Sequence, residues 1–265
     1  MRHTIAILVA GFFIAGCTPS TTVTPPSMVS GYSLTVRSYD ELASVAQQVR
    51  GQSRSVDEFA GIISVMKATV SDYADIIKIG GYASNALRVL PIPYAGEVSN
   101  GTKLVSMTLV HINNATTALD RYKKSSTKFL NDFDALHRER LTAADVAKVS
   151  AFADETLMND AMALQEAMGK IAKTSESLVA LSDMMAKGID TTSGYWDTAK
   201  GLVGMQPSAK EKETLGKTEG FRGKLVTLNQ KIAQLESSAR LNRKGIAKSR
   251  VMADIALEVE QKGSL

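Results

Sequence analysis

Cysteine, histidine and aromatic residues are all scarce in this chain of 265 residues. Cys17 is the only cysteine, which excludes a disulfide within the chain and argues against a metal site built on thiolates. Of the three histidines, neither His111 nor His137 lies in an H-E-x-x-H or E-x-x-H context, so the sequence predicts no metal site and no cofactor. Aromatic residues make up only 6% of the chain and basic residues are dispersed, so we expect no nucleic-acid partner.

Known catalytic motifs are missing as well. No serine lies in a G-x-S-x-G context, and no glycine-rich run precedes a Lys-Ser or Lys-Thr pair as in a phosphate-binding loop. Asp132 and Asp134 are two residues apart, which places their carboxylates on different faces of a helix. The sequence therefore predicts that the protein is not an enzyme. An enzyme or receptor with a site between helices is the less favoured alternative.

Long apolar runs are missing except at the N-terminus. Ile5 to Ala15 is an apolar run that follows Arg2, and it has about half the length that a membrane-spanning helix needs. The run ends in Ile14-Ala15-Gly16-Cys17, which resembles the lipobox of bacterial lipoproteins. The resemblance implies that residues 1–16 are a signal peptide that is cleaved before Cys17. It also implies that the Cys17 thiol carries a lipid that holds the protein at a membrane.

The residues that follow Cys17 extend this interpretation. Gram-negative lipoproteins retained in the inner membrane usually have an aspartate where this chain has Thr18, so the resemblance implies an outer-membrane protein facing the periplasm. Residues 17–38 are rich in serine, threonine and proline, which predicts a flexible tether behind the lipidated cysteine. The alternative is an ordinary secretory signal peptide with an incidental Cys17.

The remainder, residues 39–265, has a different pattern. Four segments repeat apolar residues in steps of three and four, which is typical of long helices with a narrow buried stripe. The sequence thus predicts an all-α domain, an elongated, mostly antiparallel bundle of about four long helices with coiled-coil-like seams. The repeating positions include Leu42, Val49, Val56, Ile63 and Val70 in the first helix, Val105, Ile112 and Leu119 in the second, Leu157, Leu164, Ile171 and Leu178 in the third, and Leu225, Leu228 and Ile232 in the fourth.

Three local signals refine this prediction. The spacing Thr142-x-x-Asp145 is close to a capping box and predicts the start of the third helix. The pattern before Leu157 is offset from the pattern after it, which indicates a stutter or kink. Glycines and the single tryptophan between residues 187 and 207 predict an irregular connection, after which the fourth helix is expected to continue to near Val259.

The segment 79–97 is the most suggestive candidate for a functional site. Its Leu90-Pro91-Ile92-Pro93-Tyr94 sequence predicts an apolar turn at the tip of a helical hairpin. Exposed apolar surface of this kind often marks a contact site, so Leu90, Ile92 and Tyr94 are candidate partner or membrane contacts. The alternative is that the tip packs against neighbouring helices as core.

These observations favour a lipid-anchored envelope protein that acts as a non-enzymatic helical scaffold or adaptor for a protein partner. The alternative is a membrane-active protein, because an apolar hairpin at the end of a long bundle is similar in layout to α-helical pore-forming toxins. Narrow seams can also be completed by a second copy of the chain, so a homo-oligomer is a further expectation.

Overall fold

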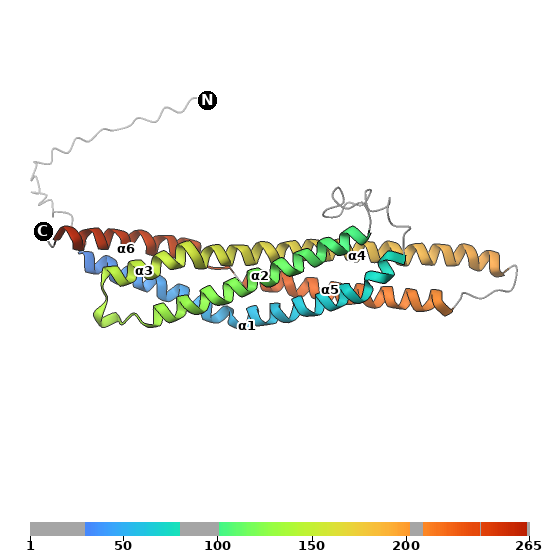
Figure 1. The fold of residues 1–265 in the computed structure, drawn as a ribbon, viewed down its shortest axis with the longest axis horizontal. Helices are drawn as coiled ribbons and strands as arrows, with labels where there is room; N and C mark the ends of the chain where they lie inside the picture. The colour runs from blue at the N-terminus through green and yellow to red at the C-terminus, as the bar shows by residue number, and fades with distance from the viewer. Residues whose placement is uncertain (1–29, 80–100, 202–208, 239, 264–265) are drawn as a thin grey trace, which may run out of the picture.

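The computed structural model describes residues 30–79, 101–201, 209–238 and 240–263, and every regular element in these ranges is helical. The helices pack against one another in a long rod (Figure 1), and no strand occurs in the described ranges, as predicted. The elements are α1 (Gly31–Ile79), α2 (Gly101–Asp134), the 3₁₀ turn η3 (Arg138–Arg140), α3 (Ala143–Phe152), the π-helical turn η4 (Ala153–Leu157), α4 (Met158–Gly201), α5 (Ala209–Ser238) and α6 (Arg243–Gly263).

The longest helix, α1, contacts four others, mainly α2, α5 and α6 and to a lesser extent α3. Helix α4 contacts α2 and α5, while α3 contacts α6. Figure 1 shows α6 beside α3 at one end of the rod and α5 beside α4 toward the other end. The same helix, α1, is therefore covered by α6 along one part of its length and by α5 along another.

The predicted seams form the hydrophobic core. Each fully buried aliphatic side chain contributes about 1.5–3 kcal/mol of stabilising free energy relative to an exposed one. The buried seam residues therefore supply much of the free energy that holds the helices together. The prediction is confirmed for the seam positions Leu42, Val49, Val56, Ile63, Val70, Val105, Ile112, Leu119, Leu157, Leu164, Ile171, Leu178, Leu225, Leu228 and Ile232, all of which are buried.

Helix α1 begins at Gly31, within the segment whose composition predicted a tether. The early residues are polar, yet Thr35 and Ser38 are fully buried. The Thr35 hydroxyl donates to the Gly31 carbonyl at 2.9 Å, and the Ser38 hydroxyl donates to the Ser249 carbonyl of α6 at 2.8 Å. Because neighbouring groups satisfy these hydroxyls, a serine- and threonine-rich segment can lie inside a helical bundle.

Two local predictions about the third helix are confirmed. Thr142 is the N-cap of α3, where its hydroxyl accepts a hydrogen bond from the Asp145 backbone N–H at 3.1 Å. The offset predicted before Leu157 coincides with the π-helical turn Ala153–Leu157. A π turn takes up one extra residue, so the buried stripe of α3 continues into α4 in spite of the change in spacing.

The predicted fourth helix is divided in two. Helix α5 ends at Ser238, and Leu241 and Asn242 are not helical before α6 begins at Arg243. The Asn242 side-chain oxygen accepts from the Gly245 backbone N–H at 3.0 Å, so Asn242 caps α6. This break was not predicted from the sequence, although asparagine is a preferred N-cap residue.

Helix α4 is longer than predicted. It continues to Gly201 through the stretch expected to be irregular, and Gly188 and Gly194 both lie within it. A glycine inside a helix costs only about 1 kcal/mol relative to alanine, so isolated glycines weaken a helix without ending it.

Candidate interaction surfaces

The four residues singled out from the sequence lie outside the described ranges. These are the proposed lipidation site, Cys17, and the three residues of the apolar turn, Leu90, Ile92 and Tyr94. The surface of the described helices provides two further features, a groove between α1 and α5 and a lysine-lined hollow on α2.

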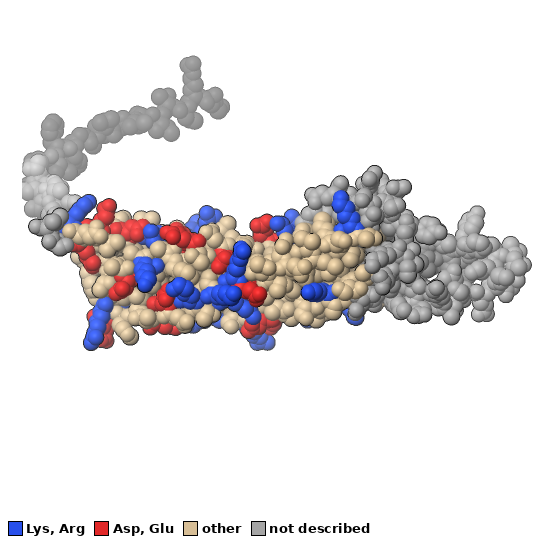
Figure 2. Space-filling view, in the orientation of Figure 1, with Lys and Arg blue, Asp and Glu red and all other residues tan. Residues whose placement is uncertain are grey.

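Charge is unevenly distributed over this surface. Helix α2 contains no lysine, arginine, aspartate or glutamate between Lys103 and Asp120. Figure 2 shows a largely uncharged surface where α2 begins and charges of both signs toward the opposite end of the rod. Val110 lies in this uncharged stretch and is 54% exposed. Protein interfaces are depleted of charge at their centres, so this stretch of α2 has the composition of a contact surface.

A groove of about 990 Å³ lies between α1 and α5. Its apolar lining includes Ile62 and Leu228, which are buried, and Val65, whose exposed fraction is 52%. The same lining includes two glycines, Gly61 on α1 and Gly223 on α5. A methyl group added to either glycine would have no heavy atom within 4 Å, so both face open space. The glycines therefore widen the groove where α1 and α5 pass each other.

The groove has charged residues on both sides. On the α1 side, Glu58 accepts a hydrogen bond from Arg54 Nε at 3.1 Å, one helical turn away. On the α5 side, Lys224 and Lys231 line the groove seven residues apart, which places them on the same face of the helix. An apolar floor with two lysines along one side fits a ligand that presents apolar groups flanked by acidic ones.

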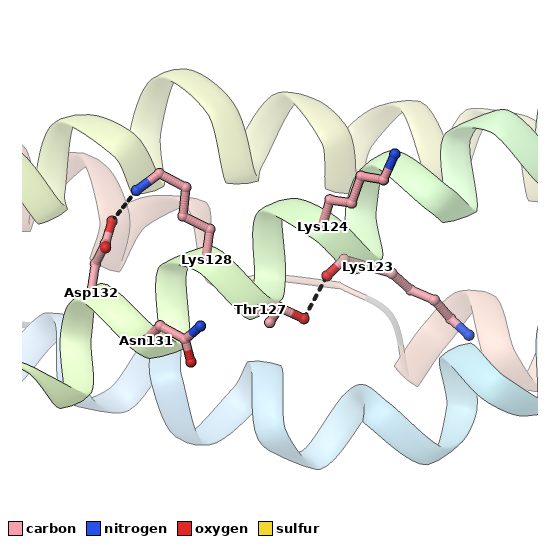
Figure 3. A pocket seen from close by; sticks show the side chains of 6 residues that line it. All are labelled: Lys123, Lys124, Thr127, Lys128, Asn131 and Asp132. Atoms are coloured by element: carbon pink, nitrogen blue, oxygen red, sulfur yellow. Dashed lines mark hydrogen bonds and ion pairs between the residues drawn. The ribbon is translucent and has the colours of Figure 1, made fainter.

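The second feature is a shallow hollow of about 500 Å³ on α2, shown in Figure 3. Two of its three lysines are engaged with other residues: Lys123 pairs with Asp57 of α1 at 2.7 Å, and Lys128 pairs with Asp132 at 2.6 Å. The Lys128 ammonium also lies 4.8 Å from the centre of the Phe152 ring. In Figure 3 the side chains of Lys123 and Lys124 point away from each other. Because the lysines do not converge, this hollow is a weaker candidate for an anion site than the groove is for a partner.

Comparisons with known proteins add no assignment. No protein family matches this chain, and no curated protein or solved structure matches it.

The described residues contain no group of three or more histidine, cysteine, aspartate or glutamate side chains placed to hold a metal ion. Of the two histidines considered above, His137 precedes η3, and His111 is half-buried within α2. None of the described helices combines the length and the apolar content required of a membrane-spanning segment.

The groove was not predicted from the sequence, although three glycines of α5 are a signal for it. Gly216, Gly220 and Gly223 were interpreted only as residues that weaken the fourth helix. Spacings of four and three also place the three glycines on one face of α5, and Gly223 lies in the groove. Small residues on one helical face indicate a close approach or an open channel, and the sequence alone does not distinguish the two.

Proposed function

We propose that the chain is a lipid-anchored protein of the bacterial envelope that acts as a non-enzymatic helical scaffold or adaptor. In this proposal a lipid on Cys17 holds it at the outer membrane, facing the periplasm. Its body is an elongated, mostly antiparallel bundle of about four long helices, and the groove between α1 and α5 receives a helix of a protein partner. The groove, with its apolar floor and open glycines, is the observation that carries the proposal.

Contacts along α1 support the antiparallel arrangement. Arg50 of α1 pairs with Asp134 of α2, and Asp57, further along α1, pairs with Lys123. The residue numbers of the α2 partners thus fall as those of the α1 residues rise, so the two helices run in opposite directions. The same order holds for α6, where Lys248 pairs with Glu41 and the Asn242 backbone N–H donates to Gln48 at 3.0 Å. Exposed ion pairs of this kind contribute about 0–1 kcal/mol each to the stability of the fold. They therefore indicate the register of the helices but add little stability.

The size of the groove supports a helical occupant. A helix is about 10 Å across, so 990 Å³ accommodates roughly two turns of one. The stretch of α1 that lines the groove, from Ser55 to Val65, is about 15 Å long at 1.5 Å per residue, which also corresponds to a few turns. We expect the partner helix to place an apolar ridge on Ile62 and Leu228 and acidic residues beside Lys224 and Lys231.

Photo-crosslinking in living cells tests this function. A crosslinkable residue at Val65, inside the groove, is compared with one at Met162, an exposed apolar residue of α4 that does not line the groove. The proposal expects a discrete protein adduct at Val65 and none at Met162. An adduct of twice the mass of the chain would identify the partner as a second copy. Equal labelling at both positions, or none at Val65, contradicts a groove partner.

The lipid anchor is tested separately. Cells fed an alkyne fatty acid should label the wild-type protein, and Cys17→Ser should abolish that label. The variant should also appear in the soluble periplasmic fraction because it has lost its anchor. If the wild-type protein takes up no fatty acid, Cys17 is not lipidated and the envelope assignment fails.

The membrane-active alternative depends on Leu90, Ile92 and Tyr94, outside the described residues. It requires that the protein release dye from liposomes and that deletion of residues 89–95 abolish the release. A crosslinkable residue at Tyr94 distinguishes the two functions in cells, since lipid adducts favour membrane activity and protein adducts favour an adaptor.

A further inference from the structure

Helix α6 has a row of exposed aliphatic side chains on one face. Val251, Ile255 and Val259 follow one another at intervals of four residues, and their exposed fractions are 57%, 45% and 42%. This spacing places the three side chains one above the other on the helix surface. Single exposed hydrophobic residues are ordinary, but an aligned set marks a surface that contacts something apolar. We refer to these three residues as the α6 stripe.

The opposite face of α6 packs against the other helices of the bundle. Ile246, Ser249, Ala253 and Ala256 are buried, and Ser249 bonds Ser38 of α1 and Ser150 of α3 at 2.9 and 2.8 Å. The α6 stripe is therefore not the core-facing side of the helix. It adds apolar surface on the side directed away from these contacts.

The α6 stripe ends beside the first residue of α1. A methyl group added to Gly31 would lie 3.3 Å from Val259 Cγ1 and 3.4 Å from the Ala256 carbonyl oxygen. The next residue, Tyr32, is 59% exposed. Figure 1 shows the end of α6 and the start of α1 at the same end of the rod. The stripe therefore lies where the N-terminal residues join the bundle.

The length of chain before α1 limits how far this end can lie from a lipid on Cys17. Residues 18–30 separate Cys17 from Gly31. At about 3.3–3.6 Å per residue, even a fully extended chain would span no more than roughly 50 Å. Helix α6 is itself about 31 Å long at 1.5 Å per residue. An anchored bundle thus keeps this end of the rod, where α6 ends and α1 begins, within reach of the headgroups.

We propose that the α6 stripe, together with Tyr32, is the face on which the anchored bundle rests in the headgroup region of the bilayer. This inference depends on the lipid anchor of the proposed function. Three aliphatic side chains are too few to hold a protein at a membrane without help, as interfacial helices usually bury a whole face. A lipid on Cys17 already holds the protein at the bilayer, so the effective concentration of the α6 stripe near the headgroups is high. A stripe with weak intrinsic affinity for lipid can therefore stay in contact with the bilayer.

Charge near the stripe determines which lipid surface it fits. Lys248 pairs with Glu41, Lys262 pairs with Glu258 at 3.6 Å, and Arg250 pairs with Asp254 at 2.9 Å. These three basic side chains of α6 are thus matched by acidic ones and form no polybasic patch of the kind that selects anionic lipids. The contact is apolar, and it should occur on zwitterionic phosphatidylethanolamine and change little with salt.

The test uses the full-length lipidated protein in vesicles of phosphatidylethanolamine with a minor share of phosphatidylglycerol. Cys17 is the only cysteine, and lipidation consumes its thiol, so an introduced cysteine is the single labelling site. Ile255→Cys carries a polarity-sensitive fluorophore, and Val110→Cys, equally apolar and exposed on α2, is the matched control. We expect a blue shift at position 255, and a loss of emission of about twofold with brominated lipids, neither of which occurs at position 110.

Three results would overturn the inference, and they differ from one another. If the wild-type protein reacts with maleimide, its thiol is unmodified, and the lipid anchor and the inference fail together. If the wild-type protein is unreactive but the label at position 255 stays in water, the inference fails and the anchor remains. If the label is shielded without vesicles and the protein doubles in mass, a second copy covers the α6 stripe in place of lipid.

Discussion

The hydroxyl of Tyr122 in α2 donates a 2.5 Å hydrogen bond to Oε1 of Gln52 in α1, and both side chains are buried. The amide of Gln52 then donates to the Arg240 carbonyl, between α5 and α6, at 3.1 Å. One turn earlier, Gln48 accepts from the Asn242 backbone N–H at 3.0 Å. Two glutamines of α1 thus satisfy backbone groups that the break between α5 and α6 leaves without helical partners. This polar contact stabilises the break inside the bundle.

The first prediction concerns Tyr122→Phe. The substitution keeps the ring but leaves the Gln52 side-chain oxygen buried without its donor, which should cost about 1–3 kcal/mol of unfolding free energy. Urea denaturation followed by circular dichroism measures this loss. Tyr32→Phe is the control, because Tyr32 is exposed and its loss of a hydroxyl should leave stability nearly unchanged. Equal stability of the two variants would show that the bond to Gln52 contributes nothing.

The second prediction is a pH dependence of the same contact. Burial raises the pKa of Tyr122 above the usual value near 10, so the folded protein keeps this phenol protonated at pH values where the unfolded chain ionises. The stabilisation from Tyr122 is therefore complete below about pH 10 and declines at higher pH, by about 1.4 kcal/mol at pH 11. The stability gap between the wild-type protein and Tyr122→Phe should narrow accordingly. A gap that stays constant from pH 8 to pH 11 would contradict this linkage.

The regular part of the fold could be predicted because the core repeats in the sequence. Val56 and Phe59 recur at the spacing of a helix that buries one stripe, and both are buried. The π-helical turn before Leu157 could also be located, because an extra residue shifts every later apolar position. These features depend on the local spacing of apolar residues, which can be seen in a single sequence.

Features that depend on distant contacts could not be predicted. Helix α1 begins at Gly31 because buried partners satisfy Thr35 and Ser38, and the Ser38 partner lies more than two hundred residues away in the chain. The groove was missed for a related reason, since Gly61 and Gly223 come to line one groove only through the packing of α1 on α5. A glycine in a helical pattern indicates reduced local stability, and only the fold shows what space it leaves.

The third prediction concerns the buried serines of α1, α3 and α6. The Ser249 hydroxyl lies 2.9 Å from that of Ser38 and 2.8 Å from that of Ser150, and all three side chains are fully buried. Ser249→Ala leaves two hydroxyls with fewer partners in an apolar surrounding, so we expect a loss of about 1–3 kcal/mol. Thr117→Ala removes an exposed hydroxyl that bonds its own helix and should change stability by less than about 0.5 kcal/mol. Equal losses would mean that water replaces the serine contacts.

The fourth prediction separates binding in the groove from stability. Gly61→Leu and Gly223→Leu place side chains in space where an added Cβ meets no heavy atom within 4 Å, so the fold should accept them. Leucine is also a better helix former than glycine by nearly 1 kcal/mol, which should leave the melting temperature equal or higher. Both variants should nevertheless lose the crosslinked partner at Val65, because the new side chains occupy the groove.

Gly51→Leu is the matched control for this prediction. Gly51 lies on α1, as Gly61 does, is exposed, and likewise has no heavy atom within 4 Å of an added Cβ, but it does not line the groove. The control should gain the same helix stability and keep the partner. If Gly51→Leu also loses the partner, the effect comes from a stiffer α1. If Gly61→Leu keeps the partner, the groove is not the docking site, and the uncharged stretch of α2 around Val110 becomes the next surface to test.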